Sequence, residues 1–99
     1  MLIACFGMHL TTKKHGGDIA WSIGSLSGGP YGDNTNYTER YCLAPGEYTL
    51  TCRNQVARGW FGGFLEIQGH KYCQDFLEYT AMRKITILGI DMNFKAYLI

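Results

Sequence analysis

The stretch that decides the fold runs Tyr41-Cys-Leu-Ala-Pro-Gly-Glu-Tyr-Thr-Leu-Thr-Cys52 and, after a break, Gly59-Trp-Phe-Gly-Gly-Phe-Leu-Glu-Ile-Gln-Gly-His-Lys-Tyr-Cys-Gln-Asp-Phe76. Tyr48, Leu50 and Cys52 alternate with two threonines, and Leu65 and Ile67 alternate with Phe64 and Glu66. This is the period of a strand with one buried face. The Pro-Gly pair before Tyr48 is typical of a tight turn. Residues 68–71 resemble the turn of a hairpin that returns Cys73 beside Leu65 and Ile67. Both halves of the stretch therefore predict antiparallel strands.

The remaining chain predicts more short strands separated by turn-rich loops. Strand-like segments are expected at 2–12, 18–24, 37–43 and 83–88, with loops at 13–17, 25–36 and 53–63 and an ambiguous segment at 74–82. This pattern predicts one all-β domain over residues 1–99, an antiparallel β-sandwich of jelly-roll or Ig-like type that contains disulfides. The side chains expected in its core are Trp21, Tyr48, Leu50, Leu65, Ile67, Ile85 and Ile87. The Gly59–Gly63 segment is expected to pack Trp60 or Phe61 over one end of that core.

Charge, hydropathy and cysteine content indicate which partners and which cellular location to expect. A net charge of +1 lacks the field expected of a nucleic-acid binder, so no nucleic-acid partner is predicted. No apolar run reaches membrane-spanning length. Four cysteines in 99 residues predict an oxidising, extracellular location for a secreted protein. Residues 1–8 lack a basic region and run into a strand-like segment, so they are not interpreted as a signal peptide.

The Cys-Leu-x-Pro-Gly-Glu-Tyr-Thr-Leu-x-Cys and Gly-Trp-x-Gly-Gly-x-Leu-Glu-Ile-x-Gly-x-x-Tyr-Cys-x-Asp-Phe patterns resemble a small repeat module of secreted and cell-surface proteins. Such modules occur in aquatic eukaryotes and, more loosely, in bacterial secreted enzymes. The resemblance covers roughly residues 19–88 and includes the strand Ile19-Ala-Trp-Ser-Ile23. Where the family has an acidic Asp-Ser-x-Gly-Asp-Gly-Trp loop, this chain has Arg53-Asn-Gln-Val-Ala-Arg-Gly-Trp60. Without those carboxylates the loop is not expected to bind calcium tightly.

The cysteines allow three pairings. The predicted hairpin places Cys73 near the central strands, with Cys42 or Cys52 as partner and Cys42–Cys73 as the preferred bond. Cys5 would pair with the remaining cysteine or stay a buried thiol. A zinc site from His70 and Cys73 with Cys52 and His9 is disfavoured, because no Cys-x-x-Cys knuckle is present. No metal and no cofactor are predicted.

Catalytic motifs are weak throughout the chain. No Gly-x-Ser-x-Gly elbow, Walker loop or Rossmann fingerprint occurs, and the three histidines are scattered. The chain is therefore predicted not to be an enzyme, and a small secreted enzyme or inhibitor ranks last among its functions.

Two functions remain ahead of that one. The first is an extracellular structural module that forms a homo-oligomer, fibre or surface appendage, in which the apolar segment Met92–Ile99 pairs within its own domain or adds as a strand to a neighbour. The alternative is a glycan- or surface-binding module that uses exposed loop residues: Trp60, Phe61, Arg53, Arg58 and Tyr31. Asn36-Tyr-Thr38 is a glycosylation sequon that fits either function.

Overall fold

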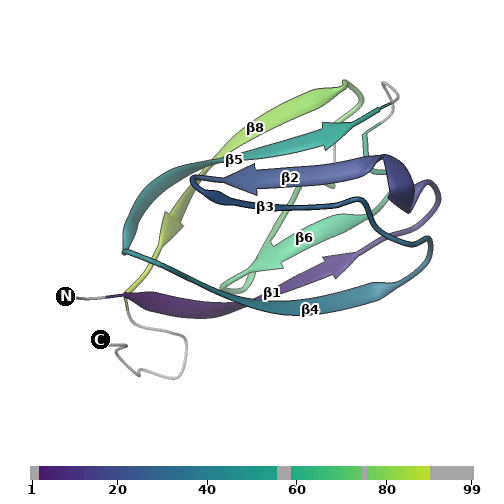
Figure 1. Ribbon diagram of the computed structural model, residues 1–99. Helices are drawn as coiled ribbons and strands as arrows, with labels where there is room; N and C mark the ends of the chain where they lie inside the picture. The colour runs from purple at the N-terminus through teal and green to yellow at the C-terminus, as the bar shows by residue number, and fades with distance from the viewer. Residues whose placement is uncertain (1–2, 56–58, 75, 90–99) are drawn as a thin grey trace.

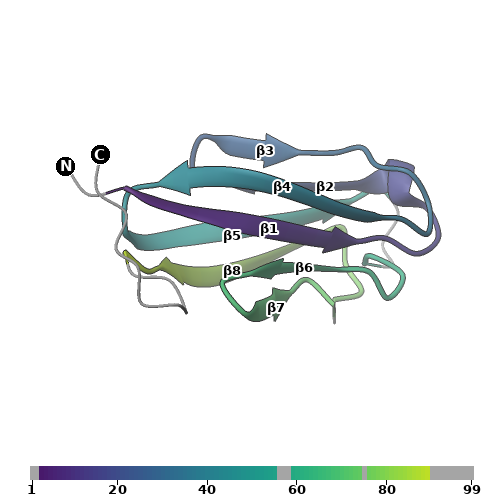
Figure 2. The ribbon, with the colours of Figure 1, turned by 90° about the horizontal axis from the view of Figure 1, so that it is seen from below.

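The structure, a computed structural model, describes residues 3–55, 59–74 and 76–89, and in them the chain is a two-layer antiparallel β-sandwich (Figures 1 and 2). One sheet has the order β4-β1-β6-β7 and the other the order β3-β2-β5-β8. The predicted all-β sandwich with disulfides is confirmed. The strands are β1 Ala4–Thr11, β2 Ile19–Ile23, β3 Leu26–Gly28, β4 Asn36–Leu43, β5 Gly46–Asn54, β6 Phe64–Ile67, β7 His70–Tyr72 and β8 Thr80–Ile87, with a 3-10 turn η1 at Gly16–Asp18.

The core lies between the sheets because each long strand buries every second side chain. In β2, Ile19, Trp21 and Ile23 are buried. They belong to one core cluster with alternate residues of β5 and β8 in the same sheet and of β1 and β6 in the opposite sheet. Six of the seven predicted core residues are fully buried. Tyr48 is only half-buried, and its hydroxyl donates a hydrogen bond to the carbonyl of Ala44 (2.6 Å) at the predicted Pro-Gly turn.

Aromatic side chains cover the side of the sandwich where β3 and β4 are the edge strands of the two sheets. The Trp21 indole N–H donates to the Tyr31 hydroxyl (2.7 Å), the Tyr31 ring packs on Tyr37 (4.9 Å between centroids), and Tyr41 meets Trp21 edge-on (5.5 Å). Burial raises the pKa of the Tyr31 hydroxyl above its ordinary value. These rings therefore seal the gap between the two sheets on that side.

Two segments differ from the predicted secondary structure. The predicted loop at 25–36 contains β3, which pairs with β2 through a turn in which Gly24 has φ of 54°. Three residues are too few to display a period of two, so the pattern gave no signal there. The ambiguous segment 74–82 contains the first three residues of β8, which begins at Thr80.

The disulfides pair Cys5 with Cys42 and Cys52 with Cys73. The preferred bond Cys42–Cys73 was wrong, whereas Cys52, the second candidate, is the partner of Cys73. Cys42 lies on β4 directly opposite Cys5 of β1, and β4 is at the far side of the sheet from β7. The sequence did not indicate that β4 has β1 as its neighbour. No described helix is long and apolar enough to cross a membrane.

Candidate functional site

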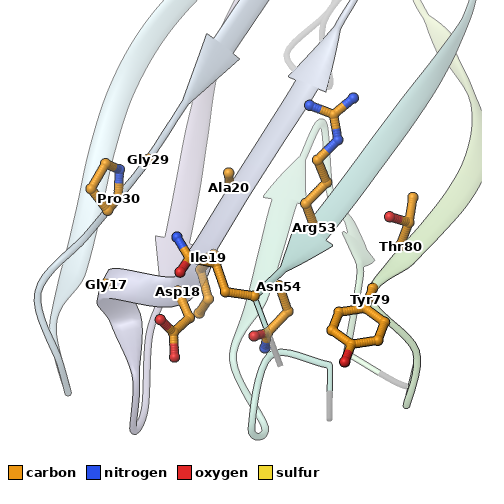
Figure 3. Close-up of a pocket in the computed structure, with 11 residues that line it drawn as sticks. Gly17, Asp18, Ile19, Ala20, Gly29, Pro30, Arg53, Asn54, Tyr79 and Thr80 are labelled. Carbon is orange, nitrogen blue, oxygen red and sulfur yellow. The ribbon is translucent and has the colours of Figure 1, made fainter. Parts of the chain in front are cut away.

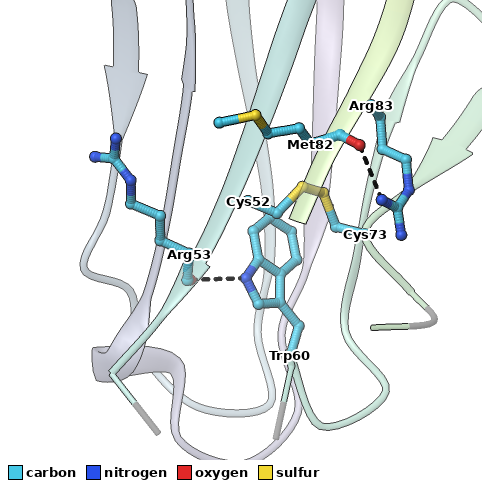
Figure 4. Close-up of a disulfide and its surroundings, with 6 residues drawn as sticks. All are labelled: Cys52, Arg53, Trp60, Cys73, Met82 and Arg83. Carbon is cyan, nitrogen blue, oxygen red and sulfur yellow. Dashed lines mark hydrogen bonds between the residues drawn. A yellow bond between two sulfur atoms is a disulfide. The ribbon is translucent and has the colours of Figure 1, made fainter. Parts of the chain in front are cut away.

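The predicted surface residues do not form one surface. Trp60 is only 2% exposed, which agrees with the expectation that the Gly59–Gly63 segment packs it over the core, whereas its expected place on an exposed binding surface was wrong. Its indole N–H donates to the backbone carbonyl of Arg53 (2.9 Å), and its ring lies close to the Cys52–Cys73 disulfide and edge-on to Phe76 (Figure 4). The glycine-rich turn that follows, closed by a hydrogen bond from Gly63 N–H to the Trp60 carbonyl (2.8 Å), accompanies this inward position.

The other predicted contact residues are divided among different places. Phe61 is half-buried and packs against the His15 ring at 4.5 Å. The Tyr31 hydroxyl accepts a hydrogen bond from the Trp21 indole N–H. Arg58 lies outside the described residues. Among the four of these residues that the structure describes, only Arg53 presents an exposed polar side chain in a pocket.

This pocket, which we call the Arg53 pocket, has a volume of about 360 Å³ and opens at the end of the second sheet where β2, β5 and β8 lie together (Figure 3). Ala20, Arg53 and Thr80 form one row across the three strands, because Arg53 is the register partner of both neighbours. The remaining lining residues are Gly17, Asp18, Ile19, Gly29, Pro30, Asn54, Gln55 and Tyr79.

Backbone hydrogen bonds hold the walls of the Arg53 pocket together. The N–H of Gln55 donates to the Asp18 carbonyl (3.1 Å), and the N–H of Asn54 donates to the Tyr79 carbonyl (2.8 Å). The segments that precede β2, follow β5 and precede β8 are thereby fixed to one another. Asp18 and Tyr79 could not be predicted from the sequence as pocket residues, because only the strand register brings positions so distant in the chain together.

The described residues that line the pocket include one cationic side chain, Arg53, and one anionic side chain, Asp18. The Asp18 carboxylate lies 3.8 Å from the His15 imidazole and is 29% exposed. The Arg53 guanidinium makes no hydrogen bond or ion pair with any described residue. No group of three described His, Cys, Asp or Glu side chains is placed to hold a metal ion, and Cys52 and Cys73 are joined in a disulfide.

A second candidate site is formed by the outer edges of the sheets. Among the described residues, β4 pairs only with β1 and β8 only with β5, so each eight-residue strand leaves one edge open. The two open edges lie on opposite sides of the sandwich (Figure 2). Large apolar side chains are exposed along β8 and its flanks at Leu77, Tyr79, Met82 and Leu88.

The sequon lies on one of these strands. Asn36 is exposed as the first residue of β4, and the Thr38 hydroxyl lies 3.1 Å from the His9 imidazole Nδ1 on β1. The sequon side chain is therefore accessible from solvent.

Comparisons with protein-family models, with curated proteins and with solved structures found no match for this chain. Any assignment of function therefore depends on the two candidate sites themselves.

Proposed function

We propose that this chain is a non-enzymatic extracellular structural module that assembles with copies of itself through the edges of β4 and β8. The observation that carries the proposal is that β4 and β8, each of eight residues, have no described strand along one edge, and that these edges lie on opposite sides of one sandwich. An open edge presents unpaired N–H and C=O groups that another strand can satisfy.

The position of the edges favours a head-to-tail contact. A β8 edge that meets the β4 edge of the next copy leaves that copy's own β8 free. Such a heterologous contact repeats without closing and gives a filament. A β8-to-β8 contact would instead stop at a dimer.

Charge favours the same arrangement. Strand β8 carries Arg83 and Lys84 and no acidic residue, so two β8 edges would bring like charges together. Strand β4 carries Glu39 beside Arg40 and so has no net charge, which means that a β8 edge meets less repulsion there than at a second β8 edge. The exposed Glu39 also accepts a hydrogen bond from the Tyr41 hydroxyl. The net charge of +1 gives little long-range repulsion between copies.

The extracellular part of the proposal is supported by the disulfides. All four cysteines are paired, one bond between neighbouring strands and the other between the sheets. Such bonds persist in oxidising compartments. Glycosylation at Asn36 belongs to this extracellular part of the proposal. Among the described lining residues of the Arg53 pocket there is no histidine or cysteine that would suggest catalysis.

Proline variants test the edge contact. Successive N–H groups of an edge strand alternate between its neighbour and the open side, and proline is tolerated where the N–H faces outward. We would make Arg83→Pro and Lys84→Pro for β8, and Glu39→Pro and Arg40→Pro for β4. From each pair, the variant that keeps the wild-type melting temperature blocks only the open edge.

Sedimentation of these variants then separates the possible contacts. Each blocked variant alone should stay monomeric, and an equimolar mixture should form a dimer and nothing larger, because one open β8 and one open β4 remain. A β4-blocked variant that still dimerises alone would contradict the head-to-tail contact. Met92–Ile99, the segment predicted to add as a strand, lies outside the described residues, and deletion of residues 90–99 tests whether assembly needs it.

A further inference from the structure

We propose that the Arg53 pocket binds a saccharide that carries a carboxylate, such as a uronic or sialic acid. This inference does not depend on edge-to-edge assembly, because the pocket lies on the outer face of the sheet and within a single copy.

The size and construction of the pocket fit a small ligand. Its volume of about 360 Å³ lies toward the low end of ligand pockets, which span roughly 300–1,000 Å³. The backbone hydrogen bonds from Gln55 to Asp18 and from Asn54 to Tyr79 fix its walls without a ligand. A fixed pocket loses little freedom when it binds.

Arg53 provides the specificity for the carboxylate of the ligand. Its side chain stands between Ala20 and Thr80 in the row across the sheet, and the methyl group of Ala20 leaves space beside it (Figure 3). No described carboxylate neutralises its guanidinium. A guanidinium binds a carboxylate through two parallel hydrogen bonds, a geometry that an ammonium group does not reproduce.

Tyr79 and the neighbouring polar groups favour a sugar ring as the carrier of that carboxylate. The Tyr79 side chain is 61% exposed at the pocket rim, so its ring offers an apolar face to the C–H groups of a sugar. Asp18, Gln55 and Thr80 provide acceptors and donors for ring hydroxyls.

A free amino acid would also bring a carboxylate to Arg53, with its ammonium group near Asp18. The Asp18 carboxylate already has a histidine at 3.8 Å, and most other polar groups of the pocket are neutral. A ligand with several hydroxyls uses those neutral groups, whereas an amino acid leaves them without partners. The lining therefore favours the saccharide.

The test is a titration of the whole chain followed by nuclear magnetic resonance. The ligands are glucuronate, galacturonate and N-acetylneuraminate, each compared with its methyl ester, which keeps the ring and removes the charge. At least one acid should shift the Ala20, Arg53 and Thr80 amide signals and bind about tenfold or more tightly than its ester, as expected for hydrogen bonds to a charged group.

Three variants test whether the Arg53 pocket causes the tighter binding of the acid than of its ester. Arg53→Gln should bind acid and ester equally, and Tyr79→Ala should weaken both by a similar factor. Lys84→Gln, which removes a cation of β8 outside this pocket, should leave both affinities unchanged. Unchanged melting temperatures would show that the variants are folded.

Three outcomes would overturn the proposal. These are no binding of any of the three acids at tens of millimolar, an acid preference that survives Arg53→Gln, and tighter binding of free glutamate than of the best saccharide. Edge variants that abolish assembly but retain the saccharide would separate this site from the proposed function.

Discussion

Gly59 and Gly62 flank the turn that turns Trp60 inward, and both have positive φ, of 66° and 89°. A Cβ at Gly59 would lie 1.8 Å from the Phe76 carbonyl oxygen, a backbone atom that cannot move aside. At Gly62 the nearest atom would be Cγ of Lys13, at 3.7 Å. The two glycines therefore have the same kind of backbone conformation but different surroundings.

We predict that Gly62→Ala costs about 1–2 kcal/mol in the free energy of unfolding, because an L-residue must adopt positive φ. Gly59→Ala should cost clearly more, because the collision adds to the same strain. Equilibrium unfolding in denaturant measures both variants. Equal losses would contradict the close approach of the Phe76 backbone to Gly59.

Tyr72 gives a prediction about alkaline pH. Burial raises its pKa above the ordinary value of 10.0. Below pH 10 the hydroxyl is protonated in the folded and the unfolded chain, and its contribution to stability is fully present. Above pH 10 the unfolded chain loses this proton first, so stability falls until the pH passes the folded pKa.

Tyr72→Phe should therefore lose less stability than the wild type between pH 9 and pH 11, as measured by denaturant unfolding at each pH. If Tyr72→Phe followed the wild-type curve instead, the partly buried position of the Tyr72 hydroxyl would be wrong.

At the scale of the elements, the two disulfides differ in exposure. Cys5–Cys42 joins neighbouring strands on an open edge, and Cys42 is exposed, whereas Cys52 and Cys73 are 0% and 2% exposed. Thiol–disulfide exchange requires a thiolate to reach a sulfur atom. The edge disulfide should therefore be reduced first under native conditions.

Timed reduction with alkylation and peptide mass mapping tests this order. Cys5 and Cys42 should be labelled many-fold faster than Cys52 and Cys73, and addition of denaturant should remove the difference. Equal labelling rates in the native protein would contradict the buried position of the Cys52–Cys73 bond. In the loop-entropy model each bond contributes about 3–4 kcal/mol, so the first reduction alone should lower the free energy of unfolding by about that amount.

Most strands could be predicted because their own residues alternate. Ile19–Ile23 and Phe64–Ile67 show this period directly, and the hairpin turn at Gln68 and Gly69 is where the pattern placed it. The partners of the strands could not be predicted in the same way. The Cys5–Cys42 bond depends on the pairing of β1 with β4, which no local pattern encodes.

The candidate site was the least predictable part of the molecule. Arg53 was recognised from its charge in a loop-like stretch. Trp60 was predicted both to pack over the core and to lie on an exposed surface, because an aromatic residue beside glycines has the same sequence pattern whether it points in or out. Asp18 and Tyr79 join Arg53 only through the register of β2, β5 and β8. A site built across three strands cannot be located until the order of those strands is known.

At the scale of the whole molecule, glycosylation should oppose assembly. A glycan on Asn36 would stand at the start of the open β4 edge. We predict that protein produced with this glycan assembles more weakly than Asn36→Gln or enzymatically deglycosylated protein, as judged by sedimentation at equal concentration. Equal assembly of all three would place the contact away from the start of β4.

The central claim is that open edges on opposite sides of the sandwich join copies head to tail. Sedimentation velocity of the wild-type chain over a wide concentration range tests it most directly. The proposed contact predicts an average sedimentation coefficient that keeps rising with concentration, without a plateau at the dimer. A single monomeric species at the highest soluble concentration, or a plateau at the dimer, would contradict it.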